Sequence, residues 1–156
     1  MLNKLRDLFR QTPPVEADND PSEVHLACVC LMIRAARIDG DYTDREQASV
    51  RDAAHTLTGL TDDDLHDLIA RAEKDEHDAS DLYRWTRHIN RAFTEEEKIH
   101  LLEGLWQIAV SEGGIHHYEA NLLRRVTGLI YIPDRESGVA RQRVMARLGK
   151  ADVMPT

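Results

Sequence analysis

Residues 35–46 read AARIDGDYTDRE, and the same pattern returns at residues 108–119 as IAVSEGGIHHYE. In both copies an apolar stretch ends at an acidic residue and a glycine, and a glutamate follows at the same spacing, Glu46 in the first copy and Glu119 in the second. Glycine is common just after a helix, because it adopts the left-handed conformation without steric cost. The repeat therefore predicts two related helical hairpins that place carboxylates at their turns.

The rest of the chain carries helical signals. A capping residue with an acid three positions later marks helix starts at residues 20–23, 43–46, 61–64 and 94–97. The stretch that ends at Arg37 is apolar on nearly all sides, which is typical of a helix at the centre of a bundle. A polar break is expected at residues 75–80, and no segment alternates with the two-residue period of a half-buried strand. We expect an all-α domain of about seven helices, packed as a bundle of antiparallel hairpins with an internal two-fold repeat.

Length and charge narrow the class of protein. A chain of 156 residues fits one domain with a full hydrophobic core. Its formal net charge of −8 argues against nucleic-acid binding, which needs clustered lysines and arginines. Acids dominate residues 39–97, whereas the C-terminal stretch is basic through Arg124, Arg125, Arg135, Arg141, Arg143, Arg147 and Lys150. We therefore expect faces of opposite charge.

The two cysteines, Cys28 and Cys30, lie in an apolar run and are expected as small core residues. Side chains two positions apart on a helix point in different directions, so a disulfide between them is not expected. Ligation of a soft element by the thiols is the alternative. Free thiols are typical of the reducing cytoplasm. No stretch reaches the ~18 apolar residues of a membrane span, and no signal peptide is visible. We therefore expect a cytoplasmic protein.

Residues 1–21 are expected to form a short amphipathic helix and a linker ahead of the main domain, residues 22–150. The apolar face of this helix consists of Leu2, Leu5, Leu8 and Phe9. Its basic residues are Lys4, Arg6 and Arg10. So short a helix is marginal alone and needs a surface to pack on. That surface is its own domain, a protein partner or neighbouring copy (which would make a homo-oligomer), or the inner face of a membrane.

The first turn is crowded with acids: Asp39, Asp41, Asp44 and Glu46 lie around its glycine. Neighbouring carboxylates repel one another unless they are solvated or share a cation. Calcium takes about six to eight oxygen ligands in flexible geometry, so Asp39, Asp41 and Glu46 could bind it together with a backbone carbonyl and waters. The spacing is not that of an EF-hand. Helix capping by Asp44 and Glu46 is the competing interpretation.

The second turn keeps two glutamates, Glu112 and Glu119, but Gly114 replaces an acid of the first turn. Glu119 is retained although His116 replaces the capping residue Thr43, which favours a ligand over a cap. His116 and Glu119 are three residues apart, so they could instead bind zinc or nickel with two further ligands.

Residues 35–43 with Glu46, and the weaker echo at residues 109–119, resemble the TerB-like family, which is associated with bacterial tellurite resistance. The resemblance spans residues 22–147 and implies an all-helical domain that binds divalent metal through acidic residues in stress-response assemblies near the membrane. By position, the ligands would be Asp39, Asp41, Glu46, Glu112 and Glu119. The chain departs from the family pattern at the second turn, where a glutamate replaces aspartate and Gly114 follows.

These observations favour a non-enzymatic stress-response module of the tellurite-resistance type, which binds a divalent cation, calcium first, through its acidic turns. No phosphate loop, nucleophile elbow or catalytic-triad motif is present in the sequence. The alternative is a structural adaptor whose acidic face docks a protein partner without metal. In either case we expect the protein in the cytoplasm, peripheral to the inner face of the membrane.

Overall fold

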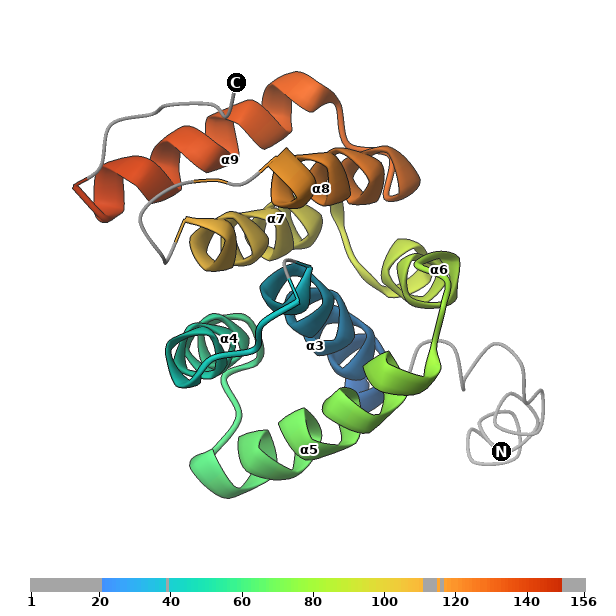
Figure 1. Cartoon of the computed structure of the whole chain (residues 1–156). Helices are drawn as coiled ribbons and strands as arrows, with labels where there is room; N and C mark the ends of the chain where they lie inside the picture. Colours follow the sequence, from blue (N-terminus) through green and yellow to red (C-terminus); the bar gives the residue numbers. More distant parts are fainter. Residues whose placement is uncertain (1–20, 39, 111–114, 116, 150–156) are drawn as a thin grey trace, which may run out of the picture.

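The computed structural model describes residues 21–38, 40–110, 115 and 117–149, and all the helices and contacts below belong to these residues. They form seven helices and no strand (Figure 1). The helices are α3 (Pro21–Arg37), α4 (Asp44–Thr58), α5 (Asp62–Asp78), α6 (Tyr83–Ala92), α7 (Glu95–Ala109), α8 (His117–Leu129) and α9 (Asp134–Arg147). The prediction of an all-α bundle is confirmed.

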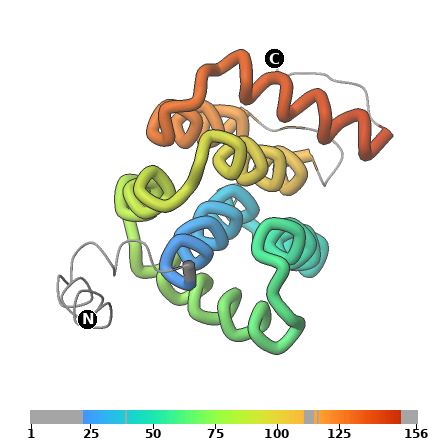
Figure 2. Tube along the Cα trace, turned by 180° about the vertical axis from the view of Figure 1, so that it is seen from behind, coloured from blue at the N-terminus to red at the C-terminus, as the bar shows by residue number. Residues whose placement is uncertain are grey.

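Helix α3 lies in the middle of the bundle, as its apolar sequence predicts. It contacts α4, α5, α6, α7 and α8, and Figures 1 and 2 show it enclosed by its neighbours from both sides. Every hydrophobic residue from Leu26 to Ile33 is buried, including Cys28 and Cys30, whose side chains have no exposed surface. The structure therefore confirms the prediction that both cysteines are core residues, and both thiols are free.

The bundle has a second layer on the other side of α7. Helix α7 packs against α3 and α4 on one side and against α8 and α9 on the other (Figure 1). A buried polar contact joins this layer: Trp106 Nε1 donates to Ser137 Oγ over 3.1 Å, and the hydroxyl oxygens of Thr127 and Ser137 lie 3.3 Å apart, within hydrogen-bond distance. Helices α7, α8 and α9 are thus held together by hydrogen bonds inside an otherwise apolar interface.

Three of the four predicted helix starts are confirmed by their capping hydrogen bonds, and the capping residue of the fourth, Asp20, lies outside the described residues. The side-chain oxygens of Thr43, Thr61 and Thr94 each accept from a backbone N–H three residues later, at the start of α4, α5 and α7. At Thr94 the box is complete, because Glu97 Oε1 also accepts from the Thr94 backbone N–H over 2.9 Å. These local bonds satisfy N–H groups that a helix cannot pair internally.

The expected polar break at residues 75–80 was wrong at its beginning. Helix α5 continues to Asp78. Its Glu76 is buried against Arg34 and Arg37 of α3, and this contact with another helix stabilises the last turn of α5. The antiparallel pairing and the internal two-fold repeat stay predictions, since most of the second turn, residues 111–114 and 116, lies outside the described residues. The predicted N-terminal helix and linker, up to residue 20, also lie outside them.

Candidate functional site

The loop between α3 and α4 is built by a glycine and a threonine. Gly40 has φ of 97°, in the left-handed region where a side chain is strained, and its N–H donates to the Arg37 carbonyl over 2.9 Å. Thr43 then takes an extended conformation and starts α4, where its Oγ1 accepts from the Glu46 N–H over 3.2 Å. The glycine ends one helix and the threonine begins the next, so the predicted acidic stretch becomes a short, sharply defined loop.

The acids of this loop do not share one environment. Asp41 and Asp44 are exposed, whereas Glu46 retains only 5% of its exposed surface. Asp39, the remaining predicted ligand, lies outside the described residues. Among the residues that the structure describes, no group of three or more His, Cys, Asp and Glu side chains is arranged to hold a metal ion.

The second turn repeats the burial of its glutamate. Glu119 is 7% exposed and lies in the first turn of α8, and Ile115 before it is buried at 8% exposure. His117 is exposed, and its Nε2 lies 3.2 Å from Asn121 Nδ2. Glu112 and His116 lie outside the described residues, so the predicted cation ligand Glu112 and the His116–Glu119 zinc pair stay predictions.

Glu46 and Glu119 thus hold equivalent positions, each nearly buried in the first turn of the helix that follows its turn. Carboxylates are seldom buried, because removal from water costs free energy that must be recovered locally. The helix N-terminus recovers part of this cost, since its dipole favours negative charge. Chemically, each position offers carboxylate oxygens a few residues after an acidic stretch of the sequence.

Two arginines at the end of α3 anchor the α3–α4 loop to α5. Glu76 of α5, itself 6% exposed, accepts from Arg34 Nε over 2.8 Å and from Arg37 Nη1 over 3.2 Å. Arg34 also donates to the Ala79 carbonyl over 2.8 Å. Because Arg37 is the last residue of α3, this network fixes the point from which the acidic loop leaves the core.

Tyr42 connects the loop to the same network. Its ring centroid lies 6.0 Å from the guanidinium carbon of Arg37, within reach of a cation–π interaction. Burial is the main cause that raises the pKa of Tyr42 to about 12, and the nearby charge of Glu73 adds to it. The phenol therefore stays protonated and uncharged at neutral pH, and the Tyr42 side chain contributes packing to the loop.

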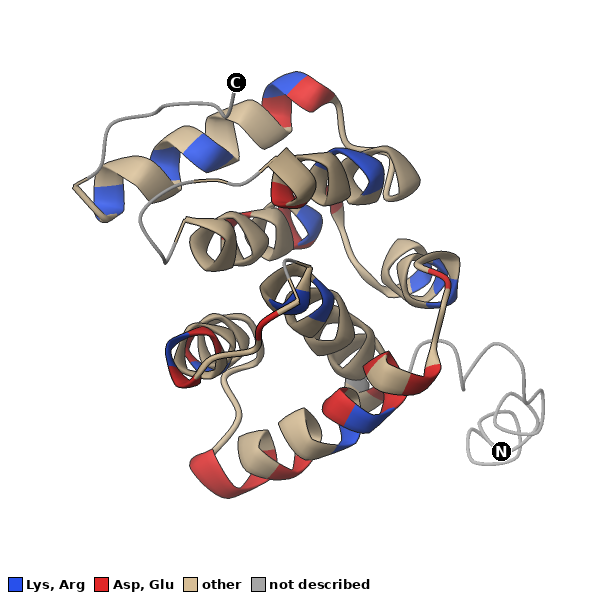
Figure 3. Cartoon of the chain, viewed as in Figure 1, with Lys and Arg blue, Asp and Glu red and all other residues tan. Residues whose placement is uncertain are grey.

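Charge is distributed unevenly over the bundle, as the sequence predicts (Figure 3). The first turn of α5 carries Asp62, Asp63 and Asp64, all exposed, whereas α9 carries the exposed arginines Arg135, Arg143 and Arg147. The two helices lie on opposite sides of the bundle in Figure 1. The acidic side offers a surface on which a basic partner could dock.

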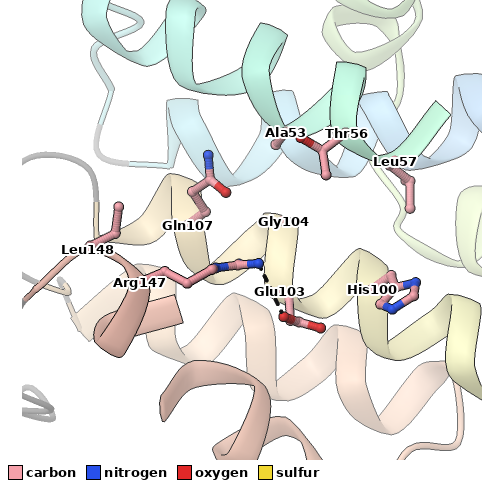
Figure 4. Close-up of a pocket in the computed structure, with 9 residues that line it drawn as sticks. All are labelled: Ala53, Thr56, Leu57, His100, Glu103, Gly104, Gln107, Arg147 and Leu148. Atoms are coloured by element: carbon pink, nitrogen blue, oxygen red, sulfur yellow. Dashed lines mark ion pairs between the residues drawn. The ribbon is translucent and has the colours of Figure 1, made fainter. Parts of the chain in front are cut away.

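A groove of about 550 Å³ opens between α4, α7 and the end of α9 (Figure 4). Its lining residues are Ala53, Thr56, Leu57, His100, Glu103, Gly104, Gln107, Arg147 and Leu148. Arg147 extends across the groove to Glu103, with 3.6 Å between Nη1 and Oε1, and Arg143 lies 4.0 Å from the other carboxylate oxygen. The Glu103 carboxylate is thus paired with two arginines whose side chains are exposed. The sequence reasoning missed this groove, because its residues come from three separate helices without a shared motif.

These features define a class of protein: an all-helical, two-layered bundle with a nearly buried glutamate in the first turn of α4 and another in the first turn of α8. The chain belongs to the TerB family, since the family model described as "Tellurite resistance protein TerB" matches residues 25–142, about three quarters of the sequence. Membership implies a role related to tellurite resistance. The match begins inside α3, ends inside α9 and includes both acidic turns.

Comparison with curated proteins gives no match, and neither does comparison with solved structures. In the described part of the chain, no helix is both long enough and apolar enough to cross a membrane.

Proposed function

We propose that this TerB-family chain is a non-enzymatic binding module whose acidic turns bind a divalent cation. The first turn is the principal site, with Asp39, Asp41 and Glu46 as ligands and calcium as the preferred ion. Glu112 and Glu119 supply the corresponding oxygens at the second turn. Bound cation stabilises the turns, and the ordered turns then present the surface that a protein partner recognises. As the family resemblance implies, the module works in the cytoplasm beside the inner face of the membrane.

The burial of Glu46 carries this proposal. A glutamate that served only as a helix cap could remain in water, as the 3.2 Å bond from its backbone N–H to Thr43 does not require the carboxylate to be buried. In this protein the Glu46 side chain is 5% exposed, and the exposed Asp41 precedes it by five residues in the α3–α4 loop. A cation shared by such oxygens recovers the cost of removing a carboxylate from water. The equivalent burial of Glu119 supports the same role at the second turn.

Thermal unfolding of chelator-treated protein tests the proposal. An ion that binds only the folded state adds about 2.7 kcal/mol of stability at a concentration one hundred times its Kd. The parent chain should therefore melt at a higher temperature with calcium than with sodium chloride of equal ionic strength. Glu46→Gln should lose this increment, whereas Asp52→Asn, which removes an exposed charge elsewhere on α4, should keep it. The same melting temperature with calcium, magnesium, manganese, zinc and sodium would refute the proposal.

A structural adaptor without metal is the second candidate, and the acidic start of α5 favours it. Asp62, Asp63 and Asp64 are exposed together at a helix N-terminus and can receive a basic partner segment without any ion. Binding through exposed charges weakens steeply as salt screens them, whereas a coordinated ion is screened less. Partner binding that is insensitive to chelator and lost at high salt would favour the adaptor over the cation module.

A further inference from the structure

A second hollow, of about 530 Å³, lies between the beginning of α3 and the first half of α5. We call it the α3–α5 groove, and its lining residues are Ser22, His25, Leu60, Asp64, Asp67, Leu68 and Arg71. Leu60 and Leu68 are half-buried and pack against the core, so they form the apolar part of the groove. Asp64 and Asp67 are exposed beside them.

The charge of the groove is negative. Arg71 is already engaged by Glu23 of α3, with 3.1 Å between Nη2 and Oε1. His25 is half-buried, and burial lowers its pKa, so it adds no positive charge at neutral pH. Asp64 and Asp67 are therefore the charges that a ligand in the groove would meet, and a fitting occupant combines apolar side chains with basic ones.

The chain itself contains such a segment. Residues 2–9 place four large apolar residues at helical spacing, Leu2, Leu5, Leu8 and Phe9. Between and after them stand the basic residues Lys4, Arg6 and Arg10, with Asp7 as the one acid of residues 2–10, so the segment is net basic. This combination complements a groove with leucines inside and aspartates beside them.

The connection is short enough for the segment to reach. Ser22, which lines the groove, is the second residue of α3, and the linker, residues 11–20, directly precedes this helix, so the linker ends at the groove itself. Ten linker residues span at most roughly 35 Å when fully extended. A short flexible linker also holds its ligand at an effective concentration on the order of millimolar. Binding within one chain is therefore favoured over binding to a second copy at ordinary protein concentrations.

We propose that residues 2–9 dock as an amphipathic helix in the α3–α5 groove of their own chain, with the leucines against Leu60 and Leu68 and the basic residues beside Asp64 and Asp67. In this arrangement the N-terminal segment covers the groove as an internal ligand. Any other basic amphipathic helix that uses the groove has to displace it. The proposal does not depend on cation binding at the α3–α4 turn.

A spin label on the full-length chain tests the proposal. Cys28 and Cys30 are completely buried, so a nitroxide reagent should modify only the thiol introduced by Asn3→Cys. With the segment docked, the label should broaden the amide signals of the groove around Leu60 and Leu68 and leave those of α9 sharp. The variant that also carries Leu5→Ser and Leu8→Ser gives the baseline of a tethered but undocked segment.

Charge variants on α5 make the test specific. Asp64→Asn with Asp67→Asn should lower the ratio of docked to undocked chains about fivefold, the effect of losing two exposed ion pairs. Asp63→Asn with Asp78→Asn changes the net charge equally on the same helix, outside the groove lining, and should leave the broadening unchanged. An equal loss of broadening in the two double variants would overturn the proposal, because it would show that only the net charge of the domain attracts the N-terminal segment.

Two further outcomes would also overturn it. In a mixture of spin-labelled chain and unlabelled, isotope-enriched chain, broadening of the enriched chain would show docking on a second copy instead. Broadening of the labelled parent no greater than the Leu5→Ser, Leu8→Ser baseline would show that the segment does not dock. If the parent then bound anionic phosphatidylglycerol vesicles and the double-serine variant did not, the segment would belong to a membrane surface.

Discussion

Removing the Glu76 carboxylate should loosen the attachment of α5 to the end of α3, directly behind the acidic turn. Glu76 is 6% exposed and accepts hydrogen bonds from Arg34 over 2.8 Å and from Arg37 over 3.2 Å. The guanidinium carbon of Arg34 also lies 5.0 Å from the centroid of the Trp85 ring, so this arginine links α3 to both α5 and α6.

The size of the effect follows from the exposure of the two arginines. The Arg34 side chain is 21% exposed, so its bond to Glu76 is a largely buried, charge-assisted one, for which about 1.5–3 kcal/mol is typical. The Arg37 side chain is 36% exposed, and its pair with Glu76 contributes roughly 0–1 kcal/mol. Glu76→Ala should therefore cost about 1.5–4 kcal/mol. Glu76→Gln keeps an acceptor for Arg34 but loses the charge, and should cost roughly half as much.

Urea unfolding followed by circular dichroism measures both variants, with Asp78→Asn as the control. Asp78 is exposed at the end of the same helix, and its change should stay within about 0.5 kcal/mol. A cost below about 0.5 kcal/mol for Glu76→Ala would refute this reasoning, since it would mean that the two arginines are as well solvated without Glu76 as they are paired with it.

Further predictions concern caps, glycines and thiols. Thr94→Ala removes the oxygen of the complete capping box and should lower the unfolding free energy by about 1 kcal/mol in urea titrations. Gly40→Ala forces a side chain to φ of 97° and should destabilise by about 1–2 kcal/mol, whereas Gly138→Ala, with open space around its Cβ in α9, should stabilise by up to about 1 kcal/mol in the same assay. Cys28 and Cys30 should resist a thiol reagent until the protein is unfolded. Burial raises the pKa of Cys28, and it raises the pKa of Cys30 to about 12. Above about pH 9 the thiols of the unfolded chain therefore ionise while those of the folded chain stay protonated. The unfolding free energy should consequently fall as the pH rises above about 9.

Signals that act within one helical turn were readable from the sequence. The caps at Thr43, Thr61 and Thr94 each need only a residue three positions away, so a short motif contains all the information. The central place of α3 was readable too, because a helix that is apolar on all sides has no other stable position.

Contacts between distant segments were not readable. Glu76 looked like part of a polar break, and only its partner 42 residues earlier, Arg34, explains why it is buried in a helix. Glu103 and Arg147 meet only because α7 and α9 pack together, and no spacing rule joins them. The acidic turns could be predicted in part. The sequence predicts where the carboxylates stand along the chain, but the burial of Glu46 depends on the packing of the whole bundle.

Calorimetric titration of the chelator-treated parent chain with calcium, followed by magnesium, manganese and zinc, tests cation binding at the α3–α4 turn most directly. We predict saturable heat with calcium that disappears in Glu46→Gln and persists in Asp52→Asn. Heats of dilution alone with all four ions, from a parent chain that is folded by circular dichroism, would contradict the proposal that this TerB-family module binds a divalent cation.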